Sequence, residues 1–396
     1  MTEKMDSRSP IKSRIGFAGM TEVDEIASPL NERLAMTEGE EMFAIDFGAR
    51  SIKVAKLRKT GEGYELDNYG VKLSPPDSII NGEILNPIAV ADALTELIGD
   101  SGLRDNRAII AITGQKVIIR EIVLPLMEDK ELLAGVMWEA PKYVPYDLDE
   151  SIIDAAKVEE FEEKEGNKMM RVLLVATPKN VVNPYMETLK KSRIIPKIVD
   201  EVSSANIRAF DHYLSDQEEK DEENSIINII LSIGASSTIL TLVEKKNLKF
   251  TRNILMGGND ITKAIAKSLN ISFEEAEKLK RDTQIELGPE TEEEKKNESE
   301  KIILKILNQM AKEVRKSLSY YKTQSQKVKY NKLILSGGCA KIKNIDKFLS
   351  EQLEIPLTIG DPIKDIKIDE KVFDLEKIKI FKESLATVIG LAKRER

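Results

Sequence analysis

The chain has 396 residues, of which 41% are hydrophobic and 32% are charged, and its formal net charge is −8 at pH 7. This is the composition of a globular protein of two to four domains, and the charge gives no sign of nucleic-acid binding. One cysteine, Cys339, excludes an internal disulfide framework. Without an apolar run of 18 residues or a signal-peptide core, we expect a cytoplasmic protein with no direct membrane insertion.

Residues 1–41 show no sustained hydrophobic period and are predicted to form a mobile N-terminal tail. The stretch FAIDFGARSIKVAKL follows and contains Asp46-Phe47-Gly48, the triplet that holds magnesium in protein kinases. A kinase also needs a glycine-rich loop and an HRD-type catalytic loop upstream, and the 45 residues before Asp46 contain neither. Apolar alternation on both sides of Gly48 instead predicts a β-hairpin.

Strands and helices alternate through the first half of the chain. The pattern predicts strands up to Val71, a helix that opens at Asn86-Pro87, and a strand-rich stretch over residues 107–125. A helix then runs to Pro141, followed by a hairpin of two strands. The remaining elements are a helix over 181–192, a strand over 197–202 and a short helix over 205–213.

An acidic stretch, Ser215–Asn224, is the predicted boundary between two halves. The second half opens with a near-continuous strand pattern that is broken at Gly234. A long helix is expected over Glu300–Lys322, and residues 288–301 ahead of it are expected to form an exposed loop or a frayed helix start. The apolar residues of that helix recur at helical spacing, which predicts a buried face.

The two halves open with similar segments. When Gly48 is laid on Gly234, DFGARSIKVAKL aligns with SIGASSTILTLV, and Ser51 falls on Ser237. Each segment reads as strand, glycine turn, strand, which suggests two equivalent lobes that face each other. Opposed glycine turns present backbone N–H groups to a cleft and can clamp phosphates from both sides. Lys53 could add a positive charge there, or it could equally be a solvated strand residue.

A second pair of glycines, Gly337-Gly338, stands between an apolar strand and a predicted helix that carries Ile342. Such a turn lets a flat ligand or a phosphate approach the backbone near a helix N-terminus. The same turn also serves close packing in many proteins. Cys339, beside it, is expected to be a packing residue because no base lies nearby in sequence.

A third pair, Gly257-Gly258, precedes a helix whose N-cap is expected at Asn259 or Asp260. The next helix carries Glu277 and Lys280, three residues apart. From spacing alone, these two side chains are expected to form a surface ion pair.

In this order the elements resemble the actin-like ATPase superfamily, and within it the PilM family of type IV pilus assembly proteins. The resemblance covers about residues 42–392 and is most specific in LPLMEDKELLAGVMWEAPKYVPYDLDESIIDAA, TRNILMGGNDITKAIAKSLNISFEEAEKLK and SLATVIGLA. It implies an α/β actin-like ATPase fold, with two lobes around a nucleotide cleft and an FtsA-type 1C subdomain inserted in the first lobe. The implied domains are 42–106 with 178–214 (1A), 107–177 (1C), 225–256 with 325–396 (2A), and 257–324 (2B).

The resemblance also implies a site for ATP and Mg²⁺. The residues expected at magnesium and phosphate are Asp46, Gly48, Ala49, Arg50, Ser51, Lys53, Gly234, Ala235, Ser236, Ser237, Thr238, Gly257 and Gly258. Those expected at adenosine are Glu277, Lys280, Gly337 and Gly338, and Asp46 is expected to hold the metal through water.

One position departs from the pattern of the family. Relatives commonly carry an aspartate two residues before the glycine of the second loop, where this chain has Ser232. A carboxylate there helps to hold magnesium and to position the attacking water, and a hydroxyl does so poorly. Binding of ATP with at most slow hydrolysis is therefore expected, and no catalytic residue is assigned.

The resemblance implies a partner as well. A groove between the inserted segment and the first lobe would receive the cytoplasmic tail of a PilN-like inner-membrane protein, alongside other pilus-assembly components. The protein would then be recruited to the inner face of the cytoplasmic membrane. Trp138, Tyr143 and Tyr146 lie in this segment and are expected to be partly buried packing residues.

Two alternatives share the same core. A small-molecule kinase of the sugar or acetate kinase type would need a catalytic base, and none can be assigned. An FtsA-like division protein would be expected to end in an amphipathic membrane helix, whereas this chain ends at GLAKRER.

Overall fold

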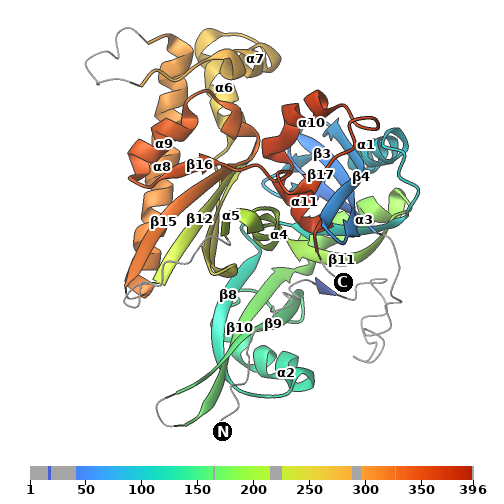
Figure 1. Ribbon diagram of the computed structural model, residues 1–396, viewed down its shortest axis with the longest axis vertical. Helices are drawn as coiled ribbons and strands as arrows, with labels where there is room; N and C mark the ends of the chain where they lie inside the picture. The colour runs from blue at the N-terminus through green and yellow to red at the C-terminus, as the bar shows by residue number, and fades with distance from the viewer. Residues whose placement is uncertain are drawn as a thin grey trace.

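The computed structural model describes residues 17–18, 42–163, 166–214, 225–287, 296–325 and 327–394. Most of the predicted N-terminal tail, the acidic stretch 215–224 and residues 288–295 of the predicted loop lie outside these ranges. Figure 1 shows two lobes side by side, with a smaller unit extending below them. Within the described ranges, no helix is both long and apolar enough to cross a bilayer.

The first lobe is built on a seven-stranded sheet of order β1-β11-β7-β2-β3-β4-β17. Its strands are β1 (Phe17–Ala18), β11 (Ile195–Glu201), β7 (Arg107–Ile112), β2 (Phe43–Phe47), β3 (Ser51–Thr60), β4 (Gly63–Leu73) and β17 (Ile366–Lys367). Successive residues of β2 point to opposite faces, so Phe43 and Ile45 enter one hydrophobic cluster and Ala44 enters another. Two short strands, β5 (Ile79–Ile80) and β6 (Glu83–Ile84), form a separate pair beside this sheet.

Helices cover both faces of this sheet. On one face pack α1 (Pro87–Asp100) and α3 (Lys179–Lys191). On the other face pack α4 (Val202–Ala209), α10 (Leu375–Phe381) and α11 (Ala386–Ala392). The predicted helix over 205–213 is in fact two, because α4 ends at Ala209 and α5 (Asp211–Leu214) follows.

The second lobe has a five-stranded sheet of order β14-β13-β12-β15-β16. Its strands are β12 (Ser225–Ile233), β13 (Thr238–Glu244), β14 (Asn247–Ile254), β15 (Val328–Ser336) and β16 (Leu357–Ile359). One face packs on α6 (Gly258–Leu269), α8 (Glu298–Gln324) and α9 (Ile345–Leu353), and α7 (Phe273–Asp282) lies beside α6. The apolar stripe of α8 is buried, as predicted. The other face, through Ile230 and Ile334, joins the core of the first lobe.

The smaller unit is a three-stranded antiparallel sheet with one helix. It contains β8 (Ile118–Pro125), α2 (Asp129–Glu139), β9 (Ser151–Glu162) and β10 (Lys168–Pro178), and it has its own hydrophobic cluster. The expected boundary at residue 107 is too early, because β7 belongs to the first-lobe sheet. We refer to Ile118–Pro178 as the inserted unit.

The end of the chain also departs from the expected division. That division places residues 325–396 in the second lobe, but β17 pairs with β4 and α11 packs on α4 of the first lobe. The α4–α11 contact is very close: a Cβ on Gly390 would lie 1.7 Å from the carbonyl oxygen of Ala205. Arg208 Nε donates to the carbonyl of Gly390 at 2.8 Å. The chain therefore returns to the first lobe, and its last helix, α11, packs there.

A hairpin of β13 and β14 links the second lobe to the inserted unit. Lys249 Nζ, on β14, lies 3.0 Å from a carboxylate oxygen of Glu121 on β8. Glu121 also pairs with Arg171 of β10 at 3.3 Å. Lys249 and Glu121 are both largely buried at this contact. The two units are thus joined by an ion pair at the far end of the hairpin.

Candidate functional site

A cleft of about 610 Å³ lies where the two lobes meet. Of the seventeen residues predicted for phosphate, metal and adenosine, the cleft is lined by all except Thr238 and Gly257, and Ser232 also lines it. This volume falls within the range of pockets for small ligands and cofactors.

The first glycine loop joins β2 to β3. The antiparallel register sets Asp46 opposite Lys53, and Lys53 Nζ lies 2.9 Å from the Asp46 carboxylate. Both side chains are largely buried, so Lys53 is not the solvated strand residue that the alternation also permitted. A Cβ on Gly48 would lie 2.8 Å from the carbonyl oxygen of Ser51, so glycine is needed for this tight turn. At the cleft, the Asp46 carboxylate is therefore neutralised by Lys53 and lies next to the backbone turn at Gly48.

Arg50 stands in the same loop. Its Nε is buried and makes no hydrogen bond to any of the described residues. A buried cationic donor without a partner is costly, and an anion in the cleft would satisfy it. The unsatisfied Arg50 Nε therefore favours an anionic ligand in the cleft.

The second glycine loop joins β12 to β13. Gly234 N donates to the carbonyl of Ser237 at 2.9 Å and closes the turn. Asn81 N, from the first lobe, donates to Ser236 Oγ at 3.0 Å across the cleft. Thr238, in contrast, is fully buried and its hydroxyl donates to the carbonyl of Met256 at 2.7 Å. Thr238 therefore supports the loop from behind and does not face the cleft.

The loop before α6 braces the second glycine loop. The helix begins at Gly258 and its N-cap is Gly257, so the expected cap at Asn259 or Asp260 is wrong. The N–H groups of Gly258 and Asn259 donate to the carbonyls of Gly234 and Ala235. A Cβ on Gly257 would lie 2.6 Å from the carbonyl oxygen of Ala235. Gly257 is thus required for close contact between the loops, behind the lining.

Glu277 and Lys280 form a buried network and not the expected surface ion pair. Lys280 Nζ lies 2.6 Å from Glu277, 2.9 Å from Thr262 Oγ1 and 3.2 Å from the carbonyl of Gly258. Burial alone would raise the pKa of Glu277, but the Lys280 ammonium and the Thr262 hydroxyl outweigh it and hold this pKa below its usual value. The network sets a charged pair at one end of the cleft.

The Gly337-Gly338 turn also lines the cleft and lies near the Lys280 network, because Cys339 and Lys280 both approach Gly258. Gly337 has φ +88°, and a Cβ there would lie 2.3 Å from the carbonyl oxygen of Ile233. Gly338 has open space around it. A short 3-10 helix, Gly338–Lys341, follows the turn, and α9 begins only at Ile345. The prediction that Ile342 belongs to this helix is therefore wrong. Cys339 is buried, as expected, and burial raises the pKa of its thiol.

Several lining residues carry no local sequence signal. Thr113, Val202 and Thr387 come from three separate segments, and Phe381 and Lys341 come from two more. Lys341 Nζ lies 5.3 Å from the centroid of the Phe381 ring, and burial lowers the pKa of this lysine. Only the folded chain brings them to the cleft.

The charge of the lining is opposite to that of the chain. Six cationic side chains face three carboxylates there. The cations are Arg50, Lys53, Lys280, Arg281, Lys341 and Lys379, and the carboxylates are Asp46, Glu277 and Glu383. In a chain of net charge −8, this focuses positive potential on the cleft. Within the described ranges, no three His, Cys, Asp or Glu side chains are grouped to hold a metal ion by themselves.

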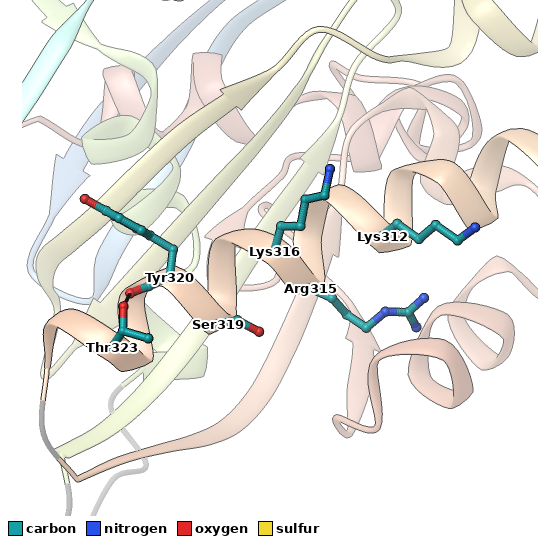
Figure 2. A pocket seen from close by; sticks show the side chains of 6 residues that line it. All are labelled: Lys312, Arg315, Lys316, Ser319, Tyr320 and Thr323. Atoms are coloured by element: carbon teal, nitrogen blue, oxygen red, sulfur yellow. Dashed lines mark hydrogen bonds between the residues drawn. The ribbon is translucent and has the colours of Figure 1, made fainter.

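A second hollow, of about 570 Å³, lies on the outer face of α8 (Figure 2). It is lined by Lys312, Arg315, Lys316, Ser319, Tyr320 and Thr323. All six side chains come from one helix, opposite its buried stripe, and none is a predicted site residue. This hollow is an exposed basic helix face, separate from the interlobe cleft.

The aromatic residues of the inserted unit are more exposed than expected. Trp138 is 83% exposed and Tyr143 is 38% exposed, whereas Tyr146 is partly buried and packs against the unit's hydrophobic cluster. The expectation of packing roles is thus wrong for Trp138. An exposed tryptophan on a surface helix is available for contact with another molecule.

Comparison with known proteins gives a family and a fold. A family model described as type IV pilus assembly protein PilM matches residues 44–396. The structure of a PilM–PilN type IV pilus biogenesis complex is 25% identical, covers 90% of this chain and 98% of that chain, and has a TM-score of 0.76.

Two further matches are more distant. The ethanolamine utilization protein EutJ from Carboxydothermus hydrogenoformans shares the fold, at 15% identity over 91% of both chains with a TM-score of 0.52. The cell division protein FtsA of Bacillus subtilis is 25% identical over 268 residues, which is 62% of this chain and 58% of FtsA. The match therefore spans less than two thirds of the length of FtsA.

Proposed function

The chain belongs to the family of the type IV pilus assembly protein PilM, and on that premise we propose that it is an ATP-binding adaptor of a pilus assembly machine. The adaptor would bind the cytoplasmic tail of a PilN-like membrane protein and so be held at the inner face of the membrane. The similar complex, which pairs PilM with PilN, supports this assignment. The two binding functions are separate and can be tested separately.

Binding of ATP is supported above all by the cationic cleft between two glycine loops. The unpartnered Arg50 Nε, the buried Lys53 and the backbone of Gly48 and Gly234 suit a chain of phosphates. At the other end, the Glu277 carboxylate suits a ribose hydroxyl, and Gly338 leaves room for a base. The residues present therefore fit the nucleotide.

Hydrolysis is proposed to be slow. Bound Mg²⁺ would neutralise phosphate charge, and Asp46 is the residue that would hold it through water. Lys53 already pairs with Asp46, so this lysine would turn to phosphate when the metal takes the carboxylate. On the opposite loop Ser232 supplies only a hydroxyl. With one carboxylate in the two loops, the cleft is better suited to hold ATP than to activate water.

The PilN-like tail is proposed to bind between the inserted unit and the first lobe. This unit has its own core and meets the first lobe where β10 lies beside α3 and β9 lies beside β1. It also presents the exposed Trp138. An FtsA-type 1C role for the inserted unit is part of this proposal.

The test is a calorimetric titration with ATP and Mg²⁺, combined with phosphate release, on the wild type and on Ser232→Asp. We expect binding by both proteins and faster release in the variant, because a carboxylate is added to the second loop. Ser319→Asp, on the far face of α8, is the matched control and should behave as the wild type. Lys280→Ala should weaken binding about tenfold, the effect of losing a charged hydrogen bond. Absence of binding by the wild type would refute the nucleotide assignment.

A further inference from the structure

The outer edge of β11 is occupied by a piece of the chain's own N-terminal segment. In the first-lobe sheet, β1 runs antiparallel to β11, with Phe17 opposite Val199 and Ala18 opposite Ile198. Cα atoms of β1 also come within 8 Å of Cα atoms of β9 in the inserted unit. Figure 1 shows β1 as a short blue arrow below β11, beside the inserted unit. The segment therefore lies where the first lobe and the inserted unit meet.

This place has the features of a site for an extended peptide. β11 would be the edge of its sheet without β1, and β9 is the edge of the three-stranded sheet. Apolar side chains accompany the two edges: Ile195 is 41% exposed, and Ile152 and Val158 are partly buried. An edge strand with open backbone groups and nearby apolar side chains binds another strand by adding it to the sheet.

The same chain can supply this strand without strain. Between Ala18 and Met42 there are 23 residues, which span up to about 75 Å when extended. Two strands, β11 and β7, separate β1 from β2, and the three strand spacings total about 14 Å. The length of chain is therefore ample for β1 to reach β11 within one molecule.

We propose that the segment around Phe17–Ala18 is an internal competitor for a partner's extended segment at the β11 edge. Each outward N–H and C=O of β11 pairs only once, so an incoming strand must displace β1. The identity of the partner strand, a PilN-like tail, rests on the proposed function. The pairing of β1 with β11 does not depend on the proposed function.

The first test uses the full-length chain with Ala18→Pro. Proline has no N–H and disfavours the ladder, so β1 should leave the edge. Neighbouring N–H groups of a strand point to opposite edges, so of Ile198 and Val199 one faces β1 and the other faces β7. Hydrogen exchange at the amide that faces β1 should then become about fivefold faster, the effect of losing one net hydrogen bond, and the other should stay unchanged. Ala35→Pro makes the same change elsewhere in residues 1–41 and should leave this exchange unchanged. Equal exchange in wild type and Ala18→Pro would overturn the pairing.

The second test measures competition. A labelled synthetic peptide of residues 11–24 is titrated into the wild type, Ala18→Pro and Ala35→Pro chains, with fluorescence anisotropy as the readout. A tethered strand acts at an effective concentration of roughly 1 mM, so its removal should tighten binding of a peptide with a Kd of about 0.1 mM about tenfold. Only Ala18→Pro should show this gain. Equal affinities for the three chains would overturn the competition.

A third titration separates this inference from the proposed function. A peptide that copies the cytoplasmic tail of a PilN protein replaces the labelled peptide, and it should also bind Ala18→Pro more tightly than the wild type. If the 11–24 peptide shows the gain but the PilN peptide binds none of the chains, the internal strand stands and the PilN assignment fails. If the PilN peptide binds all three chains equally, the PilN assignment stands and the internal competitor is refuted.

Discussion

Gly258 offers a sharp test of how the cleft is packed. A Cβ at this position would lie 2.6 Å from Cys339 Sγ, about 1 Å closer than a normal contact, and 3.3 Å from Lys280 Nζ. The sulfur is buried, so Gly258→Ala must push it and the Gly337-Gly338 turn aside. Overpacking of this kind costs about 1–3 kcal/mol. We therefore expect a lower unfolding midpoint in urea, followed by circular dichroism.

The same geometry predicts that the cost depends on the sulfur. In a Cys339→Ala background the close atom is gone, and the nearest remaining atom is Lys280 Nζ at 3.3 Å, which needs to move only slightly. Gly258→Ala should then cost less than about 0.5 kcal/mol, since alanine favours the first turn of a helix over glycine. The double-mutant cycle should give a coupling of about 1–2 kcal/mol.

A neighbouring glycine supplies the control. A Cβ on Gly257 would meet backbone atoms of Ala235 and Ser237, at 2.6 and 2.8 Å. Gly257→Ala should therefore destabilise the protein equally in both backgrounds. If Gly258→Ala lowers the unfolding free energy by the same amount with and without Cys339, the contact of α6 with Cys339 does not restrict this position, and the reasoning is refuted.

Three further predictions concern the helix contact, the single histidine and the ion pair at the inserted unit. Gly390→Ala would place a Cβ 1.7 Å from a carbonyl oxygen of α4, so it should lower the unfolding free energy, measured in urea, by more than about 3 kcal/mol. Gly99→Ala is the control: a Cβ there would have no atom within 4 Å, so the change should be neutral or stabilising. Burial lowers the pKa of His212, so its contribution to stability is complete above the unfolded pKa of about 6.5 and is lost as pH falls below that value and through the lower folded pKa. The drop in unfolding free energy between pH 7.5 and 5.5 should be smaller in His212→Gln, and an equal drop contradicts this. Removal of Lys249 and Glu121, singly and together, should give a coupling of about 1 kcal/mol in unfolding free energy, and additive losses would show that the pair is not formed in solution.

Both glycine loops of the cleft could be predicted from sequence because their signal is local. Strand alternation around Gly48 and Gly234 is sufficient to place each turn, and the structure has a turn at each. Burial of Glu277 and Lys280 could not be predicted in this way. Their spacing is equally that of a surface pair, and only the packing of α7 beside α6 covers them.

The later part of the chain was harder to predict for a topological reason. After β16 the chain leaves the second lobe and returns to the first, where β17 and α11 pack. No local pattern records which sheet a short strand joins. The same crossing brings Phe381 and Thr387 to the cleft, so these lining residues were missed together with the crossing.

The β13–β14 hairpin governs which motions of the lobes are independent. It begins at the second glycine loop, ends just before Gly257, and is tied at its tip to Glu121 of the inserted unit. With 7 residues in β13, the hairpin is about 23 Å long, so tilting the second lobe by about 5° moves the tip by about 2 Å. Such a tilt either carries the inserted unit along or breaks the Lys249–Glu121 pair. Any ligand that changes the tilt is then thermodynamically linked to whatever binds the inserted unit, and each alters the affinity for the other by the same factor.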